Sequence, residues 1–195
     1  MLYQKRQRLA QFTEFAEKVK KRDFNTCKFC GFTAEANMTV VNLDHNYRNN
    51  VASNLVTSCP LCAQCHFIEY IGCGDNNGGI LIYMPELSQA ELNGLCHALF
   101  CAIANATMHE HTAQNLYNSL RLRAQAVEQV YGEGRSDPAV FGKMVINTPS
   151  SDSDALQKHV LKDLRILANI SSFSEQIKSW SMQAASSMNT GILNK

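Results

Sequence analysis

Two pairs of cysteines constrain the fold of this 195-residue chain more than any other feature. In each pair two residues separate the cysteines, as in Cys27-Lys-Phe-Cys30 and Cys59-Pro-Leu-Cys62. One turn of backbone can then aim both thiolates at the same ion, and four thiolates at tetrahedral corners suit zinc and leave no open coordination position. We therefore expect one structural zinc ion per chain, and a binding role rather than catalysis.

The sequence offers two choices for the second pair of zinc ligands. A further pair with the same spacing, Cys62-Ala-Gln-Cys65, overlaps the first, and His66 follows it directly. The second pair of zinc ligands is therefore either Cys59 with Cys62 or Cys62 with Cys65, and Cys65 and His66 are the alternative ligands.

The amino-acid composition indicates a cytosolic protein. No stretch approaches the ~18 apolar residues that cross a bilayer, and the N-terminus lacks the apolar core of a secretion signal. In a reducing cytosol, paired cysteines indicate metal ligands rather than disulfides. The formal net charge of +1 predicts no general affinity for nucleic acid or membranes. The basic run from Lys5 to Arg22 is interpreted as a solvated helix face, with nucleic-acid binding as a further hypothesis.

Apolar periodicity, interrupted by glycine- and proline-rich stretches, divides the chain into five sections. We expect an N-terminal helix, a core with strands around the cysteines, a helical pair, a connecting segment with little regular structure, and C-terminal helices. The first of the C-terminal helices rests on the spacing of Leu156, Val160, Leu164 and Leu167. This pattern predicts the α+β class, with a small zinc-binding core in a mainly α-helical protein. The sections are 1–22, 23–85, 86–131, 132–152 and 153–195.

The segment between the cysteine pairs resembles the HNH endonuclease family. Asp44-His45 is followed by Asn54-Leu55 and then by the second cysteine pair. The resemblance implies a ββα zinc-binding core. It also favours the register of Cys59 with Cys62, because in that family Asn-Leu falls just ahead of the second pair.

The same resemblance raises the question of catalysis. An HNH nuclease uses its histidine as a general base, and it holds a divalent ion with the aspartate and a later His or Asn. Here those residues would be Asp44, His45 and His66. The last ligand normally follows the second cysteine pair directly, and this chain has Ala63 there. Because the catalytic set is incomplete, we expect no enzymatic activity, with a metal-dependent HNH-type nuclease as the alternative function.

A narrower resemblance covers nearly the whole chain from about Lys18 onward. It is carried by Cys27-Lys-Phe-Cys-Gly-Phe32, by the long stretch from Leu81 to Asn93, and by Ser136-Asp-Pro-Ala-Val-Phe-Gly142. These segments are similar to the IcmJ (DotN) family of the Dot/Icm type IVB secretion system. The last two contain no metal chemistry that could explain the likeness by convergence.

Membership of that family would imply a non-catalytic adaptor with an HNH-like zinc core and an α-helical remainder. The implied partners are the C-terminal extension of the coupling ATPase and the other subunits of the coupling complex. The implied location is cytoplasmic and peripheral to the bacterial inner membrane, through the complex.

Overall fold

The structure is a computed structural model. It describes the backbone of residues 2–72, 78–149 and 161–192, and the side chains of all of these except 2 and 185–192. Contacts within the chain divide it into two compact units, Met1–His66 (unit 1) and Phe67–Lys195 (unit 2). Helices predominate, and the described part of each unit contains a two-stranded sheet. The predicted α+β class is therefore confirmed. None of the described helices is long and apolar enough to cross a bilayer.

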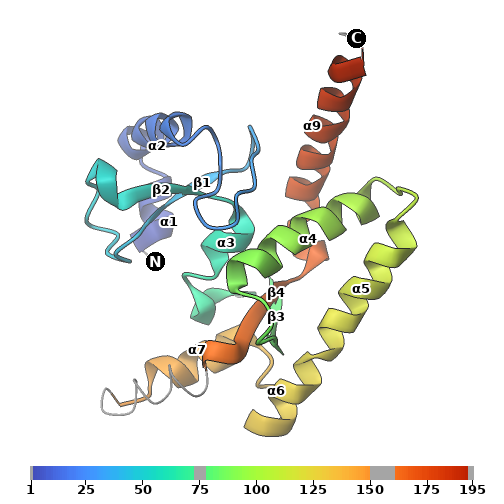
Figure 1. The fold of residues 1–195 in the computed structure, drawn as a ribbon. Helices are drawn as coiled ribbons and strands as arrows, with labels where there is room; N and C mark the ends of the chain where they lie inside the picture. Colours follow the sequence, from blue (N-terminus) through green and yellow to red (C-terminus); the bar gives the residue numbers. More distant parts are fainter. Residues whose placement is uncertain (1, 73–77, 150–160, 193–195) are drawn as a thin grey trace. The chain divides into compact units, whose positions relative to one another are not determined.

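Unit 1 has two short strands with helices packed on both of their faces (Figure 1). β1 and β2 pair antiparallel, from Thr39 opposite Ser58 to Asn42 opposite Leu55. Neighbouring strand residues point to opposite faces, so one face contributes buried Val40 to a core with α2, and the other contributes Val41 to a core that includes Ala63 of α3. The elements are α1 (Leu2–Gln7), α2 (Ala10–Arg22), β1 (Thr39–Asn42), the 3-10 helix η1 (Ala52–Asn54), β2 (Leu55–Ser58) and α3 (Pro60–Gln64).

The N-terminal section is two helices rather than the single expected helix, because the backbone is extended at Leu9. The break lets the guanidinium of Arg6, in α1, stack 4.0 Å from the ring centroid of Phe12, in α2. On a continuous helix, residues six apart lie about 9 Å apart along the axis and on different faces. Arg6 is 5% exposed and donates hydrogen bonds to Asn42, Asn50 and the Val40 carbonyl.

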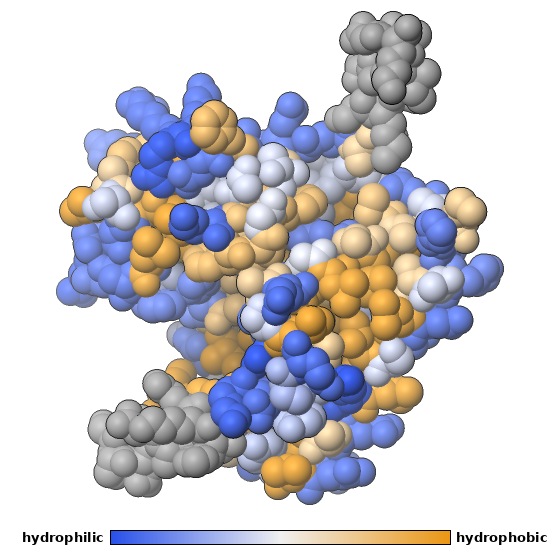
Figure 2. Space-filling model, in the orientation of Figure 1, coloured by the Kyte–Doolittle hydropathy of each residue, from blue (hydrophilic) through white to orange (hydrophobic). Residues whose placement is uncertain are grey.

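The burial of Arg6 corrects the expectation that all the basic residues of this run face solvent. On α2 most of the basic side chains do face solvent, and the visible surface of this helix is mostly hydrophilic (Figure 2). There Lys18 pairs with Glu14 in the solvent.

Unit 2 packs helices around a second antiparallel pair of strands, β3 and β4, which runs from Gly79 opposite Ala168 to Tyr83 opposite Leu164. Helix α4 begins with the capping box formed by Ser88 and Glu91. The elements are the 3-10 helix η2 (Ile68–Tyr70), β3 (Gly79–Tyr83), α4 (Gln89–Ala104), α5 (Glu110–Leu122), α6 (Ala124–Tyr131), α7 (Pro138–Ile146), η3 (Leu161–Asp163), β4 (Leu164–Ala168), η4 (Ile170–Phe173) and α9 (Ser174–Ile192).

Strand β4 occupies part of the stretch for which leucine spacing predicted a helix. Residues 156 and 160 of that pattern lie outside the described residues, whereas Leu164 and Leu167 lie in the strand. The buried backbone of β3 at Leu81 and Ile82 requires hydrogen-bonding partners, and β4 provides them with a strand in which Leu167 and Ala168 are fully buried. The pairing also groups β3 with unit 2, whereas the sequence grouped it with the cysteines in residues 23–85.

Helix α7 lies where a connecting segment with little regular structure was expected. The Asp137 side chain accepts hydrogen bonds from the backbone N–H groups of Ala139 and Val140, and Pro138 occupies the first helical position. The helix is held by packing: Phe141 is fully buried, and Gly142 lies so close to the backbone of Glu69 that a Cβ there would approach it to 2.8 Å. Local capping and tertiary packing thus favour the same helix.

Candidate metal centre

The first cysteine pair lies on a tight backbone turn between α2 and β1. The N–H of Cys27 donates to the carbonyl of Phe32 at 2.8 Å, and the N–H of Gly31 donates to the carbonyl of Cys27 at 3.0 Å. Gly31 has a φ of +74°, a conformation that a residue with a side chain rarely adopts. The turn therefore depends on the glycine that directly follows Cys30, and it directs both sulfurs of the pair to one side.

The second cysteine pair lies at the start of α3, directly after β2. Cys59 is the residue that caps this helix: its backbone is extended, Pro60 follows at the first helical position, and its sulfur accepts a hydrogen bond from the N–H of Cys62 at 3.4 Å. Strand, cap and first helical turn thus bring Cys59 and Cys62 together.

The four cysteines form one cluster. The sulfurs of Cys27, Cys30, Cys59 and Cys62 all lie within 4.8 Å of one another. The Cys30 and Cys59 sulfurs are 3.7 Å apart, too far for a disulfide bond of about 2.05 Å. Zinc–sulfur bonds of about 2.3 Å would place two thiolates of a tetrahedron about 3.8 Å apart, close to that separation. Cys30 is partly exposed, and the other three are buried.

Electrostatics within the cluster favour a cation. Hydrogen bonds with Cys27 first, and then with Cys30 and Cys62, raise the pKa of Cys59. Contacts with Cys27 first, and then with Cys30, raise the pKa of Cys62. Although its contact with Cys30 raises it, hydrogen bonds with Cys59 and Cys62 lower the pKa of Cys27 to about 6. One thiolate therefore forms at the expense of the others, and a divalent ion would stabilise all four together. The donor set fits such an ion.

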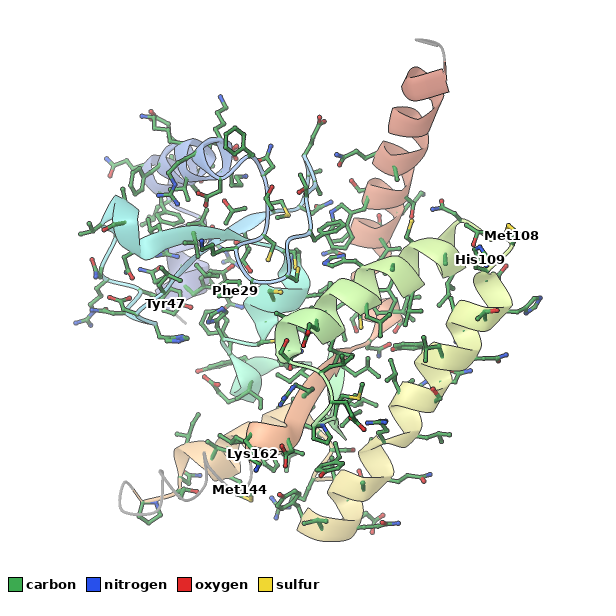
Figure 3. All side chains as sticks on the ribbon, in the orientation of Figure 1. Phe29, Tyr47, Met108, His109, Met144 and Lys162 are labelled. Atoms are coloured by element: carbon green, nitrogen blue, oxygen red, sulfur yellow. The ribbon has the colours of Figure 1, made fainter. Side chains whose placement is uncertain are left out.

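The alternative ligands of the shifted register lie apart from the cluster. The thiol of Cys65, the residue directly after α3, donates a hydrogen bond to the carbonyl of Leu61 in that helix at 3.3 Å. The ring of His66 lies beside Phe29, with centroids 5.1 Å apart (Phe29 is labelled in Figure 3). The structure therefore supports the register in which Cys59 and Cys62 lie with Cys27 and Cys30.

Asp44 and His45, the candidate nuclease residues, lie on the loop after β1. The Asp44 carboxylate accepts hydrogen bonds from the side chains of Asn49 (2.7 Å) and Asn54 (2.8 Å) and from the N–H of Asn46 (2.9 Å). These bonds, that from Asn49 first, lower the pKa of Asp44. The carboxylate is thus ionised, and it serves to hold the loop in shape.

His45 and His66, which the HNH resemblance placed in one candidate site, lie close together. Their Nδ1 atoms are 3.3 Å apart. Burial first, and the charge of His45 second, lower the pKa of His66 to about 4. In the part of the chain that the structure describes, the four-cysteine cluster is the one group of three or more His, Cys, Asp or Glu side chains whose ligand atoms all lie within 4.8 Å of one another. The structure therefore brings the two histidines together without Asp44.

Comparison with known proteins gives a full-length relative. No model of a known protein family matches the chain. The "Type 4 apparatus protein DotN" of Legionella pneumophila is 47% identical to it over 183 residues, which is 94% of this chain and 85% of that protein. Similarity at this level over both chains is far beyond what a shared cysteine motif would give. The chain therefore belongs to the DotN family of type 4 apparatus proteins.

Proposed function

We propose that this protein is a zinc-stabilised adaptor subunit of a type IVB secretion coupling complex. The observation that carries the proposal is the 47% identity to DotN over 94% of the chain. The match covers 183 residues and so extends over both units rather than over the cysteine segment alone.

Zinc is the metal that we assign to the four-cysteine cluster. Thiolate ligands select soft and borderline ions, and a closed set of four suits zinc in a structural site. Cys27, Cys30, Cys59 and Cys62 would hold it and leave no position for a substrate. The cluster joins the turn after α2 to the start of α3, so the ion would stabilise a unit whose own apolar core is small.

The proposed partners are the C-terminal segment of the coupling ATPase and the other subunits of the coupling complex, at the cytoplasmic side of the inner membrane. Exposed aliphatic side chains support a protein-binding role. On consecutive helices α5 and α6, Leu116, Leu122 and Val130 are 41%, 62% and 71% exposed. Exposed apolar side chains of this kind are available to contact another protein.

Co-purification with a defined partner tests this proposal. The full chain and a tagged C-terminal segment of the coupling ATPase from the same bacterium are co-expressed, and the complex is analysed by size-exclusion chromatography with light scattering. A complex of fixed stoichiometry that survives dilution is expected. An unrelated segment of the same length serves as the control. Elution of the chain and the ATPase segment as separate species would contradict the adaptor function.

A metal-dependent nuclease is the second candidate, and the contact between His45 and His66 is the observation in its favour. Against it, the Asp44 carboxylate is engaged by Asn49 and Asn54. Plasmid cleavage in Mg²⁺ or Mn²⁺ that is abolished by His45→Ala would establish the nuclease. If His45→Ala left the observed cleavage unchanged, the nuclease function would be ruled out.

A further inference from the structure

We propose that the turn between α2 and the first cysteine pair docks onto another protein of the coupling complex, with Phe24 entering an apolar pocket that carboxylates border. The turn spans residues 23–28 and is called the Phe24 turn below. This inference rests on the adaptor function, and it adds to that function a contact surface in unit 1.

Phe24 occupies a backbone position that favours glycine. Helix α2 ends in a Schellman motif, in which the N–H of Phe24 donates to the carbonyl of Lys21 at 3.1 Å and the N–H of Asn25 donates to the carbonyl of Lys20 at 2.8 Å. The residue after the C-cap, Asp23, has a left-handed backbone in this motif, and Phe24 accordingly has a φ of +54°. Glycine adopts this conformation freely, whereas the Cβ of any other residue strains it.

The Phe24 side chain gains no packing within the chain that would offset this strain. It is 83% exposed, more than any other large hydrophobic side chain described in unit 1. Backbone strain of this kind clusters at sites of binding and catalysis. An aromatic ring loses little rotamer freedom when it is buried by a partner, and such rings are frequent hot spots of interfaces. The position therefore indicates a contact with a group outside the chain.

Hydrogen bonds hold the Phe24 turn against strand β2. The Asp23 carboxylate accepts a hydrogen bond from the N–H of Thr57 at 2.8 Å, and the N–H of Lys28 donates to the carbonyl of Thr57 at 2.9 Å. Within the turn, the N–H of Thr26 donates to the carbonyl of Asp23 at 3.0 Å, and its hydroxyl donates to the carbonyl of Phe24 at 3.1 Å. Both ends of the turn are thus fixed to one strand residue, so little backbone entropy remains to be lost on binding.

Two lysines flank Phe24 and determine the charge of the partner. Lys21 and Lys28 are exposed, and neither forms an ion pair in the part of the chain that the structure describes. Carboxylates around the pocket of the partner would complement both ammonium groups and accelerate association.

The number of unpaired cations favours a protein over nucleic acid or a lipid surface. Of the four cations of α2, Lys21 alone is outside an ion pair, because Lys18 pairs with Glu14, Lys20 with Glu17, and Arg22 with Asp23. Affinity for nucleic acid comes from several phosphate contacts, and recognition of anionic lipid takes a cluster of about four or more cations. One protruding ring between two lysines matches a protein pocket with an acidic border.

Photo-cross-linking in the assembled complex tests the proposal. Benzoylphenylalanine replaces Phe24 in the full chain, which is co-expressed with the coupling ATPase and the other coupling-complex subunits of the same bacterium. Mass spectrometry then identifies the cross-linked residues. We expect a cross-link to one protein subunit, at an apolar residue with Asp or Glu close by, and loss of most of this cross-link when Lys21→Glu and Lys28→Glu are added.

The outcomes separate this inference from the adaptor function. A complex that assembles but gives no cross-link from position 24, or a cross-link only to nucleic acid or lipid, would overturn the inference and leave the adaptor function standing. A wild-type chain that does not assemble with the other subunits would overturn both.

Substitution of Phe24 gives a second, independent measurement. Asparagine tolerates a positive φ, so Phe24→Asn should raise the midpoint of thermal unfolding of the free chain by about 2–4 °C. The same substitution should weaken binding to the complex assembled without this chain about thirtyfold, as measured by titration with the fluorescently labelled chain. The matched control is Asn25→Gly, which keeps the ring, suits the φ of +50° at this position and should leave the affinity unchanged. A lower midpoint in Phe24→Asn would show that the ring is structural, and an unchanged affinity would show that it is no contact; either result would overturn the proposal.

Discussion

Replacement of Cys62 by serine is expected to unfold unit 1 while leaving the strands of unit 2 protected. A structural zinc ion in a cysteine cluster contributes on the order of 10 kcal/mol to folding. Unit 1 spans only residues 1–66, and a single apolar core of that size supplies about 3–5 kcal/mol. The loss of even half of the metal contribution would therefore equal or exceed the stability that remains.

Hydrogen exchange measured by mass spectrometry checks this prediction. Backbone amides of β1 (Thr39–Asn42) and β2 (Leu55–Ser58) should lose their protection in Cys62→Ser, together with the bound zinc. Amides of β3 and β4 should keep theirs, because those strands pair with each other within unit 2.

Cys65→Ser is the matched control, because Cys65 directly follows α3 but its thiol bonds to the Leu61 carbonyl outside the cluster. This variant should keep its zinc and the protection of β1 and β2. The reasoning would be refuted if Cys62→Ser kept one zinc ion per chain with β1 and β2 protected, or if Cys65→Ser lost the metal.

Three further predictions follow from individual side chains. Phe141→Ala should lower the free energy of unfolding of unit 2 by about 3–5 kcal/mol, because the ring is fully buried. The control Val140→Ala, at an exposed position, should change it by no more than about 0.5 kcal/mol. Denaturant unfolding measures both. Tyr117→Phe should lower the free energy of unfolding by about 1–3 kcal/mol, because the buried hydroxyl donates a hydrogen bond to the carbonyl of Ala168 at 3.0 Å. An unchanged midpoint of thermal unfolding would contradict this prediction. His66 should titrate near pH 4 by NMR. Because its folded pKa lies below its unfolded value, unit 1 should lose stability as the pH falls from about 6.5 to 4. If His66→Gln showed the same pH dependence of stability, protonation of His66 would be excluded as its cause.

Several local features of the fold could be predicted from sequence because neighbouring residues produce them. The capping box of Ser88 and Glu91 requires residues only three apart in the chain. The predicted apolar stripe of the N-terminal helix is buried at Phe12, Ala16 and Val19, whereas its first member, Leu9, precedes α2 and is exposed. The start of α7 shows that such signals can also be missed, since Asp137-Pro138 is a helix start in a segment that glycine and proline content marked as irregular.

Long-range pairing decided what local patterns could not. The leucines of β4 have a spacing compatible with a helix, and only the availability of β3 as a partner makes that segment a strand. Arg6 reads as one of several surface cations, yet its guanidinium is enclosed because the chain bends at Leu9. In both cases the outcome depends on groups that arrive from elsewhere in the chain.

The amino-acid sequence by itself determined that two cysteine pairs can each present their sulfurs to one ion, because two intervening residues form a single turn. Tertiary structure decided which pairs meet. The extended backbone at Cys59 and the hydrogen bond of Cys65 to Leu61 in the preceding helix select the register. Pairing of β1 with β2 fixes the strand that leads into Cys59, whose sulfur lies 3.7 Å from that of Cys30. The physical reason is one of range: spacing controls geometry within a turn, whereas contact between distant turns depends on burial and hydrogen bonding throughout the unit.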